Sequence, residues 1–281
     1  MIVKRVGLVV PSLNVVVEDD MRRMTPADVG VHIARLRLRK TQGRVTQAAL
    51  LEAGQDAIEQ STMLADAQVD AICFNCTGAS LSDGPAGARR LRDELAEASN
   101  TPSTTTILSV VRMLREVGVR RLLHVCPFTP EFGADEADFL RKEGFDVVAS
   151  RGLNFTDARL AAKLTPEEIV DIAVALTVPE AEGIFLACAN VRAWEATPEL
   201  ERRLGKPVVT SNQAVAWDLL DLIAFLEGAG RKDHAAPTPV TGLMATGIKA
   251  AGFLALTRLL FVTFPANAEL WQPVLGILAI L

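Results

Sequence analysis

The feature that most constrains the fold is an alternation of short apolar runs with longer helical patterns along the first 228 residues. The runs have the length and β-branched content of strands, and they lie at 5–10, 29–38, 69–75, 103–108, 120–126, 145–150, 183–189 and 206–211. Helical patterns occupy 46–67, 86–99, 108–118, 134–144 and 165–177. Strands that alternate with helices form parallel sheets covered on both faces, so the sequence predicts an α/β fold.

The runs divide into two sets of four near Gly118. We expect two similar Rossmann-like domains, each a four-stranded parallel sheet flanked by helices, with the active site in the cleft between them. The first half covers 1–117 and is completed by a helix at 212–228, and the second covers 118–211. Ligands of open parallel sheets bind at the carboxyl ends of the strands, where the loops after each run converge.

Two of these strand ends carry the same arrangement of residues. The stretches "AICFNCTGAS" and "GIFLACANVR" place Cys76 and Cys188 after apolar runs, 112 residues apart. A thiol beside the backbone N–H groups of a turn that enters a helix favours the thiolate form. Two such thiols could each exchange a proton with a small carboxylate substrate, or one could add covalently while the other protonates.

Composition excludes several other classes of protein. The net charge of −5, without a dense Lys/Arg run, argues against a nucleic-acid partner. The N-terminal apolar run is too short for a secretory signal, so we expect a cytoplasmic protein with reduced thiols. Cys73 and Cys76 form a C-x-x-C pair, but further zinc ligands are not evident, and no metal is expected. Cys73 and Cys126 are interpreted as small buried hydrophobic residues. No phosphate-binding motif is present, and no cofactor is expected.

Six segments together carry a family resemblance. In chain order they are "GLVVPSLNVVVEDDM", "CTGASL", "LLHVCPFTPE", "GLNFTD", "LACANVRAW" and "VVTSNQA". They resemble the maleate cis-trans isomerase and arylmalonate decarboxylase branch of the aspartate/glutamate racemase superfamily, over about residues 3–228. The resemblance implies two similar α/β domains and cofactor-independent chemistry on small carboxylates. It also implies that Asn14 holds a substrate carboxylate, that Cys76 adds to the substrate, and that Cys188 acts as acid or base.

The surrounding loop residues are expected to bind the substrate, namely Ser12, Thr77, Gly78, Phe128, Ala189 and Asn190. Arylmalonate decarboxylase has glycine in place of Cys76, so the presence of both thiols favours isomerisation of a maleate-like dicarboxylate. Decarboxylation of an arylmalonate and racemisation of an amino acid remain alternatives, as does a non-catalytic protein that binds a small carboxylate. This chain departs from its relatives at Phe128, where they have tyrosine, and at Ala158, where they have asparagine.

Some of these residues also have purely structural interpretations. Asn14 could cap a helix that begins near Val15. His32 and His124 lie in predicted strands, where histidines are usually structural. Arg35, Arg37 and Arg39 alternate with leucines, as on the solvent face of an edge strand.

The apolar tail at 231–281 does not follow the α/β pattern. It resembles a membrane segment of subunit N of the proton-pumping NADH:quinone oxidoreductases, and such a composite could arise by gene fusion or by a frameshift. Lys249 and Arg258 make an isolated membrane span costly, so an amphipathic hairpin on the domain is the alternative. Membrane contact is expected only through this tail, and we expect a homo-oligomer.

Overall fold

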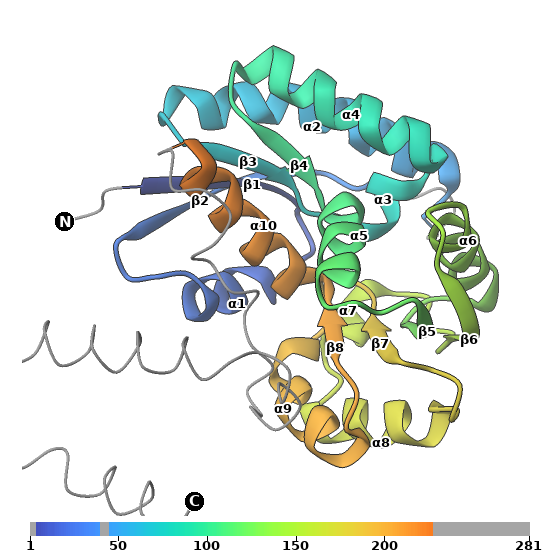
Figure 1. Ribbon diagram of the computed structural model, residues 1–281. Coiled ribbons are helices and arrows are strands. Elements are labelled where there is room, and N and C mark those ends of the chain that lie inside the picture. The colour runs from blue at the N-terminus through green and yellow to red at the C-terminus, as the bar shows by residue number, and fades with distance from the viewer. Residues whose placement is uncertain (1–3, 40–44, 227–281) are drawn as a thin grey trace, which may run out of the picture. The chain divides into compact units, whose positions relative to one another are not determined.

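The computed structural model describes residues 4–39 and 45–226, which contain two four-stranded parallel sheets (Figure 1). The first has the order β2-β1-β3-β4 and consists of β1 (Lys4–Pro11), β2 (Val29–Leu36), β3 (Ala71–Phe74) and β4 (Ser103–Thr105). The second has the order β6-β5-β7-β8 and consists of β5 (Arg121–Cys126), β6 (Asp146–Gly152), β7 (Gly183–Leu186) and β8 (Val208–Thr210). The same relative strand order in both sheets confirms the predicted α/β architecture.

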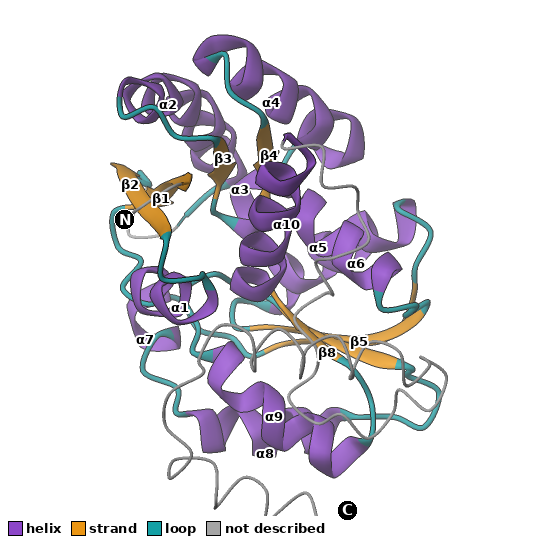
Figure 2. Ribbon diagram, turned by 60° about the vertical axis from the view of Figure 1, so that its left-hand side comes forward, coloured by secondary structure: helices purple, strands orange, loops and turns teal. Residues whose placement is uncertain are grey.

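Helices cover both faces of each sheet (Figure 2). Around the first sheet are α1 (Val17–Met24), α2 (Gln47–Asp66), α3 (Thr77–Leu81), α4 (Gly84–Ser99), α5 (Thr106–Glu116) and α10 (Ser211–Leu226). Around the second are α6 (Pro130–Lys142), α7 (Ala158–Ala161), α8 (Pro166–Leu176) and α9 (Ala193–Leu204). The last helix, α10, returns to the first sheet, where Val215 and Leu219 pack against Val6 and Leu8 of β1.

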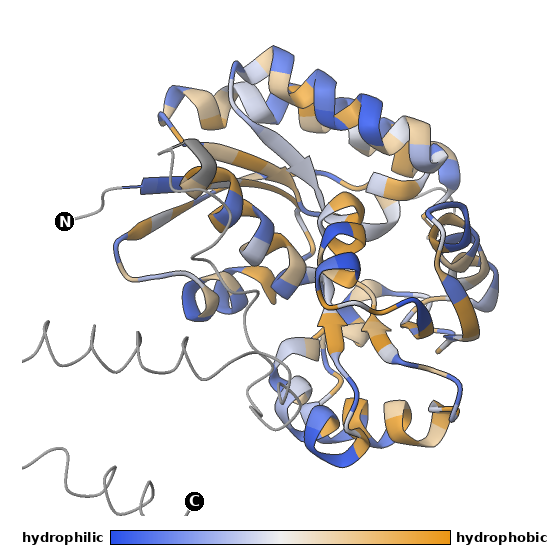
Figure 3. Ribbon diagram, viewed as in Figure 1, coloured by the Kyte–Doolittle hydropathy of each residue, from blue (hydrophilic) through white to orange (hydrophobic). Residues whose placement is uncertain are grey.

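The sequence explains why these elements form and end where they do. Thr165 and Glu168 make a reciprocal capping box at the start of α8. Gly118 and Gly144 follow the last turns of α5 and α6 with φ of 73° and 92°, a conformation that glycine adopts without steric cost. Strand side chains alternate between two apolar layers, and Figure 3 shows the hydrophobic residues concentrated on the strands and on the inner faces of helices.

One sequence prediction about local structure is wrong, and one helix was not predicted. The run 103–108 forms a strand only as far as Thr105, and Ile107 and Leu108 belong to α5. A short apolar run does not distinguish a strand from a buried helix, and here the core takes these side chains in helical spacing. Helix α9 was not predicted, because Pro198 lies inside it and proline usually ends a helix.

Within the described ranges, no helix combines the length and the apolar character that crossing a bilayer requires. The predictions for the tail at 231–281 fall on residues outside these ranges.

Candidate active site

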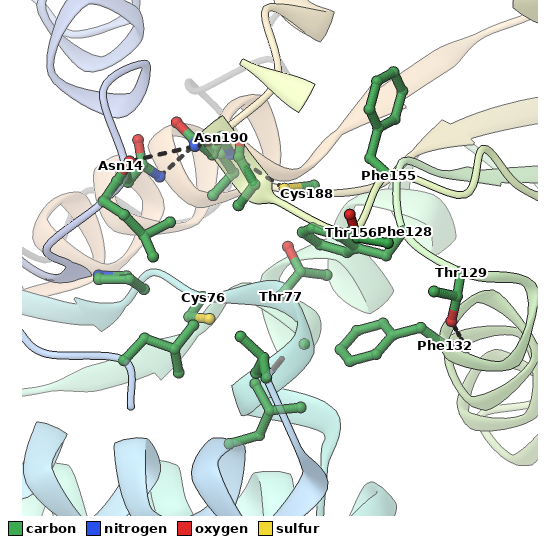
Figure 4. Close-up of a pocket in the computed structure, with 18 of the residues that line it drawn as sticks. Asn14, Cys76, Thr77, Phe128, Thr129, Phe132, Phe155, Thr156, Cys188 and Asn190 are labelled. Carbon is green, nitrogen blue, oxygen red and sulfur yellow. Dashed lines mark hydrogen bonds between the residues drawn. The ribbon is translucent and has the colours of Figure 1, made fainter. Parts of the chain in front are cut away.

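A cavity of about 580 Å³ lies at the carboxyl ends of the strands, and both halves contribute to its wall (Figure 4). The first half supplies Pro11, Leu13, Asn14, Leu38, Val45, Leu50, Asn75, Cys76, Thr77 and Gly78. The second supplies Phe128, Thr129, Glu131, Phe132, Asn154, Phe155, Thr156, Ala158, Cys188, Ala189 and Asn190. Both cysteines therefore face one space, as the matching strand ends predicted. Among the described residues Glu131 is the one charged side chain of this wall.

Cys76 lies at the first of these strand ends, in an ordinary extended conformation. Its φ of −149° and ψ of 105° place it at the N-cap of α3, directly after β3 and Asn75. The next turn is crowded, because a Cβ atom on Gly78 would lie 2.7 Å from the Phe132 ring. Only glycine leaves room for that ring, which closes the wall of the cavity beside Cys76.

Cys188 occupies the equivalent place in the second half with a different backbone. Its φ is 90°, a left-handed conformation that costs a non-glycine residue about 1–3 kcal/mol. The thiol accepts a hydrogen bond from the Asn190 backbone N–H at 3.4 Å. A turn at Ala189 and Asn190 follows this cysteine and leads to α9, which begins at Ala193, so the expected turn ahead of a helix is present.

The N–H groups of the two turns lower the pKa of each thiol, as expected, but burial outweighs this effect. Burial raises the pKa of Cys76 to about 11, against the lowering effect of a hydrogen bond from the Ala79 backbone. Burial is also the main reason that the pKa of Cys188 is raised to about 12. The Asn190 backbone N–H opposes this rise, and the Glu136 carboxylate and the other thiol contribute to it. Desolvation disfavours the charged form and outweighs the single N–H bond that each sulfur accepts. Both groups are thiols at neutral pH when the cavity holds no substrate.

Asn14 joins the two halves. Its Oδ1 accepts hydrogen bonds from the backbone N–H groups of Val16 and Val17 at 2.9 and 3.1 Å, ahead of α1. Its Nδ2 donates to the carbonyl of Ala189 at 3.0 Å. The capping interpretation thus accounts for the oxygen, whereas one hydrogen of Nδ2 holds the Cys188 turn. Asn14 also lines the cavity, where its substrate-binding role stays a prediction.

Five of the six other predicted binding residues line the cavity, and one does not. Thr77, Gly78, Phe128, Ala189 and Asn190 line the cavity, whereas Ser12 is exposed and is not part of the lining. Thr77 Oγ1 lies 3.0 Å from Ser211 Oγ, so its hydroxyl is engaged with α10.

Asn190 connects the cavity to the loops on either side. Its Nδ2 donates to the carbonyl of Ala158 at 3.0 Å, and its Oδ1 accepts from the Val15 backbone at 2.9 Å. Ala158 itself lines the cavity, where the relatives' asparagine would stand.

Sequence reasoning missed several residues that shape the site. Phe132 packs edge-on against Phe128, with ring centroids 5.4 Å apart, and both line the cavity. Arg35, interpreted as a solvent-facing residue of an edge strand, donates to the carbonyls of Ser12 and Asn14 at 3.2 and 2.9 Å. No local motif identifies these roles, since the partners meet only when the loops fold together.

A buried histidine–glutamate pair lies on the second sheet. His124 Nε2 is 3.0 Å from Glu136 Oε2, and its Nδ1 is 3.0 Å from Ser150 Oγ, in agreement with a structural histidine. Cys73 and Cys126 are fully buried, and burial raises the pKa of each, as expected for thiols of the core. The described ranges contain no group of three or more His, Cys, Asp or Glu side chains arranged to hold a metal ion.

Comparison with known proteins shows to which family the chain belongs. The model of the arylmalonate decarboxylase family matches residues 6–232, so the chain belongs to this family. Arylmalonate decarboxylase of Bordetella bronchiseptica is 29% identical over 219 residues, which cover 77% of this chain and 89% of the relative. Maleate isomerase of Pseudomonas putida is 26% identical over 242 residues, which cover 80% and 95%. The relatives are enzymes, and the chain is an enzyme of the same family.

Solved structures agree on the fold. A mutant of Nocardia farcinica maleate cis-trans isomerase with a covalently bound succinylcysteine intermediate superimposes with a TM-score of 0.71 at 24% identity, over 78% of this chain and 92% of that one. A separate short match, 56% identical over 46 residues, is to NADH-quinone oxidoreductase subunit N of Trichlorobacter lovleyi. It covers 16% of this chain and 9% of that protein, in line with the resemblance noted for the tail.

Proposed function

We propose that the chain is a cofactor-independent isomerase of a maleate-like dicarboxylate. The observation that carries this proposal is that Cys76 and Cys188, one from each half, face the same cavity. Arylmalonate decarboxylase chemistry, by the resemblance, needs only the second of these thiols. A covalent succinylcysteine in a protein of the same fold supports addition of a thiol to the substrate.

The proposed reaction balances without an external reagent. The Cys76 sulfur forms a C–S bond to one alkene carbon, the π bond breaks, and the other carbon takes a proton from Cys188. The proton released from Cys76 restores the Cys188 thiol. Rotation then occurs about the carbon–carbon bond that was the double bond and is now single. The reverse of the addition steps gives the trans acid and regenerates both thiols.

High thiol pKa values fit this order of events. A thiol with a pKa of about 12 is a proton donor at neutral pH, which suits Cys188 as the acid of the addition step. The cysteine that adds must lose its proton, and Cys76, with the lower pKa of about 11, is the easier of the two to ionise. The substrate carboxylates would be bound by neutral donors, among them the remaining N–H of Asn14 and the backbone N–H groups of the two turns.

Decarboxylation of an arylmalonate is the second candidate, because the cavity is roomy and largely apolar. Leu38, Leu50, Phe128, Phe132 and Phe155 form much of its wall, and about 580 Å³ exceeds what a four-carbon diacid fills. A substrate with an aromatic or alkyl substituent would use this apolar surface.

A substrate screen separates the candidates. We expect the purified protein to convert maleate or an alkyl-substituted maleate into its trans isomer, followed by NMR. Release of carbon dioxide from phenylmalonate without any isomerase activity would favour the decarboxylase. Racemisation of an amino acid would favour the racemase alternative, and binding of carboxylates without turnover would leave a binding protein.

A further inference from the structure

A buried side chain connects the turns of the two cysteines. Asn212 is the second residue of α10, and its Oδ1 accepts a hydrogen bond from Nδ2 of Asn75 at 3.4 Å. Its Nδ2 donates to the carbonyl of Ala189 at 3.0 Å. Asn75 immediately precedes Cys76, and Ala189 immediately follows Cys188. One amide therefore touches the chain next to each thiol, although the two thiols belong to different halves of the molecule.

The surroundings fix which way this amide points. Its Nδ2 also donates to Oδ2 of Asp20 on α1 at 2.8 Å, so two acceptors face the same NH₂ group. On the opposite side, Asn75 Oδ1 accepts from the Thr106 hydroxyl at 3.3 Å, which leaves the Asn75 NH₂ to face Asn212. An amide is the one side chain of this size that offers both an acceptor and two donors.

Asp20 acts as an acceptor under working conditions. Burial raises the pKa of this carboxyl group to about 6, and the hydrogen bond from Asn212 opposes the rise. Glu195, Arg23 and Asp19 also act on it electrostatically, at smaller magnitude. At pH 7 and above the group is mainly ionised, and a carboxylate accepts a stronger hydrogen bond than a neutral group does.

Burial makes this network costly to disturb. The exposed fractions of Asn75, Asn212 and Asp20 are 0%, 3% and 2%. Buried polar groups that lose a partner are not compensated by water, so the three side chains hold one arrangement. The preceding residue of α10, Ser211, adds a contact to Thr77 on the Cys76 side at 3.0 Å.

We propose that Asn212 is a positioning residue that holds the Cys76 and Cys188 turns at a fixed separation, and that Asp20 orients its amide. Asn212 acts through Asn75 and Ala189 and does not line the cavity. The catalytic consequence of this role rests on the proposed two-thiol function. The mechanical consequence, a fixed placement of both thiols, does not.

The test compares Asn212→Ala and Asp20→Ala with the wild type, using turnover and the rate of iodoacetamide alkylation at each cysteine, resolved by mass spectrometry. We expect Asn212→Ala to lower kcat at least about tenfold, with KM changed less than about threefold. We also expect its alkylation rates at Cys76 and Cys188 both to change by more than about threefold. Asp20→Ala should act in the same direction, more weakly.

Two further variants serve as controls. Asp20→Asn keeps an oxygen acceptor for the Asn212 amide, so it should stay within about threefold of the wild type. Gln213→Met removes the neighbouring amide of α10, which is similarly buried and has an unpartnered Oε1 within the described ranges. This variant should leave both alkylation rates unchanged. Buried Cys73 and Cys126 report unfolding, because they should react in a variant only if it opens.

Each outcome decides the proposal. Unchanged kcat and unchanged alkylation in folded Asn212→Ala would overturn it, and so would a change confined to one thiol. If Asn212→Ala unfolds, Asp20→Ala decides by the same criteria. A wild type without activity on any tested acid, combined with altered alkylation of both thiols in Asn212→Ala, would support the positioning role and reject the proposed function.

Discussion

The Cys76 and Cys188 turns occupy equivalent places in two sheets of the same strand order and differ in almost every local detail. Cys76 has an extended backbone and begins a helix of five residues. Cys188 has a φ of 90°, stands in a turn, and is followed at Ala189 by a carbonyl that accepts two side-chain amides.

The shared strand order places both thiols at the same edge of their sheets. The backbone conformation at each cysteine then differs, and so do the hydrogen bonds that hold it. A left-handed cysteine persists only where its surroundings hold it, and Asn14 and Asn212 supply that hold through the Ala189 carbonyl. The Cys76 turn has no comparable strain. Cys188, whose turn is strained and is held by two side-chain hydrogen bonds, is the thiol that we propose as the proton donor. Proton transfer from this thiol requires a fixed direction toward the substrate carbon.

The largest expected effect tests whether both cysteines are needed for turnover. Cys76→Ser and Cys188→Ser should each lower kcat on the isomerase substrate by at least about 10², since a serine hydroxyl is a far weaker nucleophile and acid. The double mutant should be little worse than the poorer single mutant, because the pair acts as a unit.

Steady-state kinetics of the three variants, with Cys126→Ser as the buried control, check this prediction. Full isomerase activity in Cys76→Ser would disprove the two-thiol mechanism. A decarboxylase would instead lose its activity on an arylmalonate in Cys188→Ser and tolerate Cys76→Gly.

The second prediction separates the thiols by acidity. Because burial raises both pKa values, to about 11 and about 12, each cysteine is protonated near neutral pH. Alkylation of both should therefore speed up about tenfold per pH unit between pH 7 and 9, with Cys76 the faster. Alkylation followed by mass spectrometry over this range measures it, and a plateau below pH 8 at either cysteine would contradict the assigned shift.

The third prediction concerns the cavity wall between the turns. Phe128→Tyr restores the phenol of the relatives and should raise kcat/KM on maleate by about two- to tenfold, by one added hydrogen bond to the substrate. Phe132→Tyr is the matched control, since its ring packs against Phe128. A fall in activity on maleate would indicate that the phenylalanine suits a bulkier, less polar ligand.

The smallest effect distinguishes the two backbones directly. At position 188, the glycine variant should have a free energy of unfolding about 1 kcal/mol higher than that of the alanine variant, because glycine adopts a φ of 90° without strain. At position 76 the two variants should differ by less than about 0.5 kcal/mol, because the freedom that glycine gains in the unfolded state is offset by its better fit at a helix N-cap. Urea denaturation of Cys188→Gly, Cys188→Ala, Cys76→Gly and Cys76→Ala measures the difference, and an equal preference for glycine at both positions would refute it.

The sequence by itself determined the α/β class, the two sets of four strands and the pairing of Cys76 with Cys188 at matching strand ends. These features rest on apolar periodicity and on the rule that parallel strands end at one edge, both of which are local or generic. It also identified the buried character of Cys73 and Cys126, because each lies within an apolar run.

Only the tertiary structure decided the protonation of the two thiols, the left-handed turn at Cys188 and the amide of Asn212 between the halves. The thiol pKa values depend on desolvation by the walls that both halves contribute, and to a smaller extent on the charge of the buried Glu136. The bonds of Asn212 join residues 137 and 23 positions away in the chain, to Asn75 and Ala189. No local pattern encodes such contacts, because they exist only once the sheets and α10 have packed together.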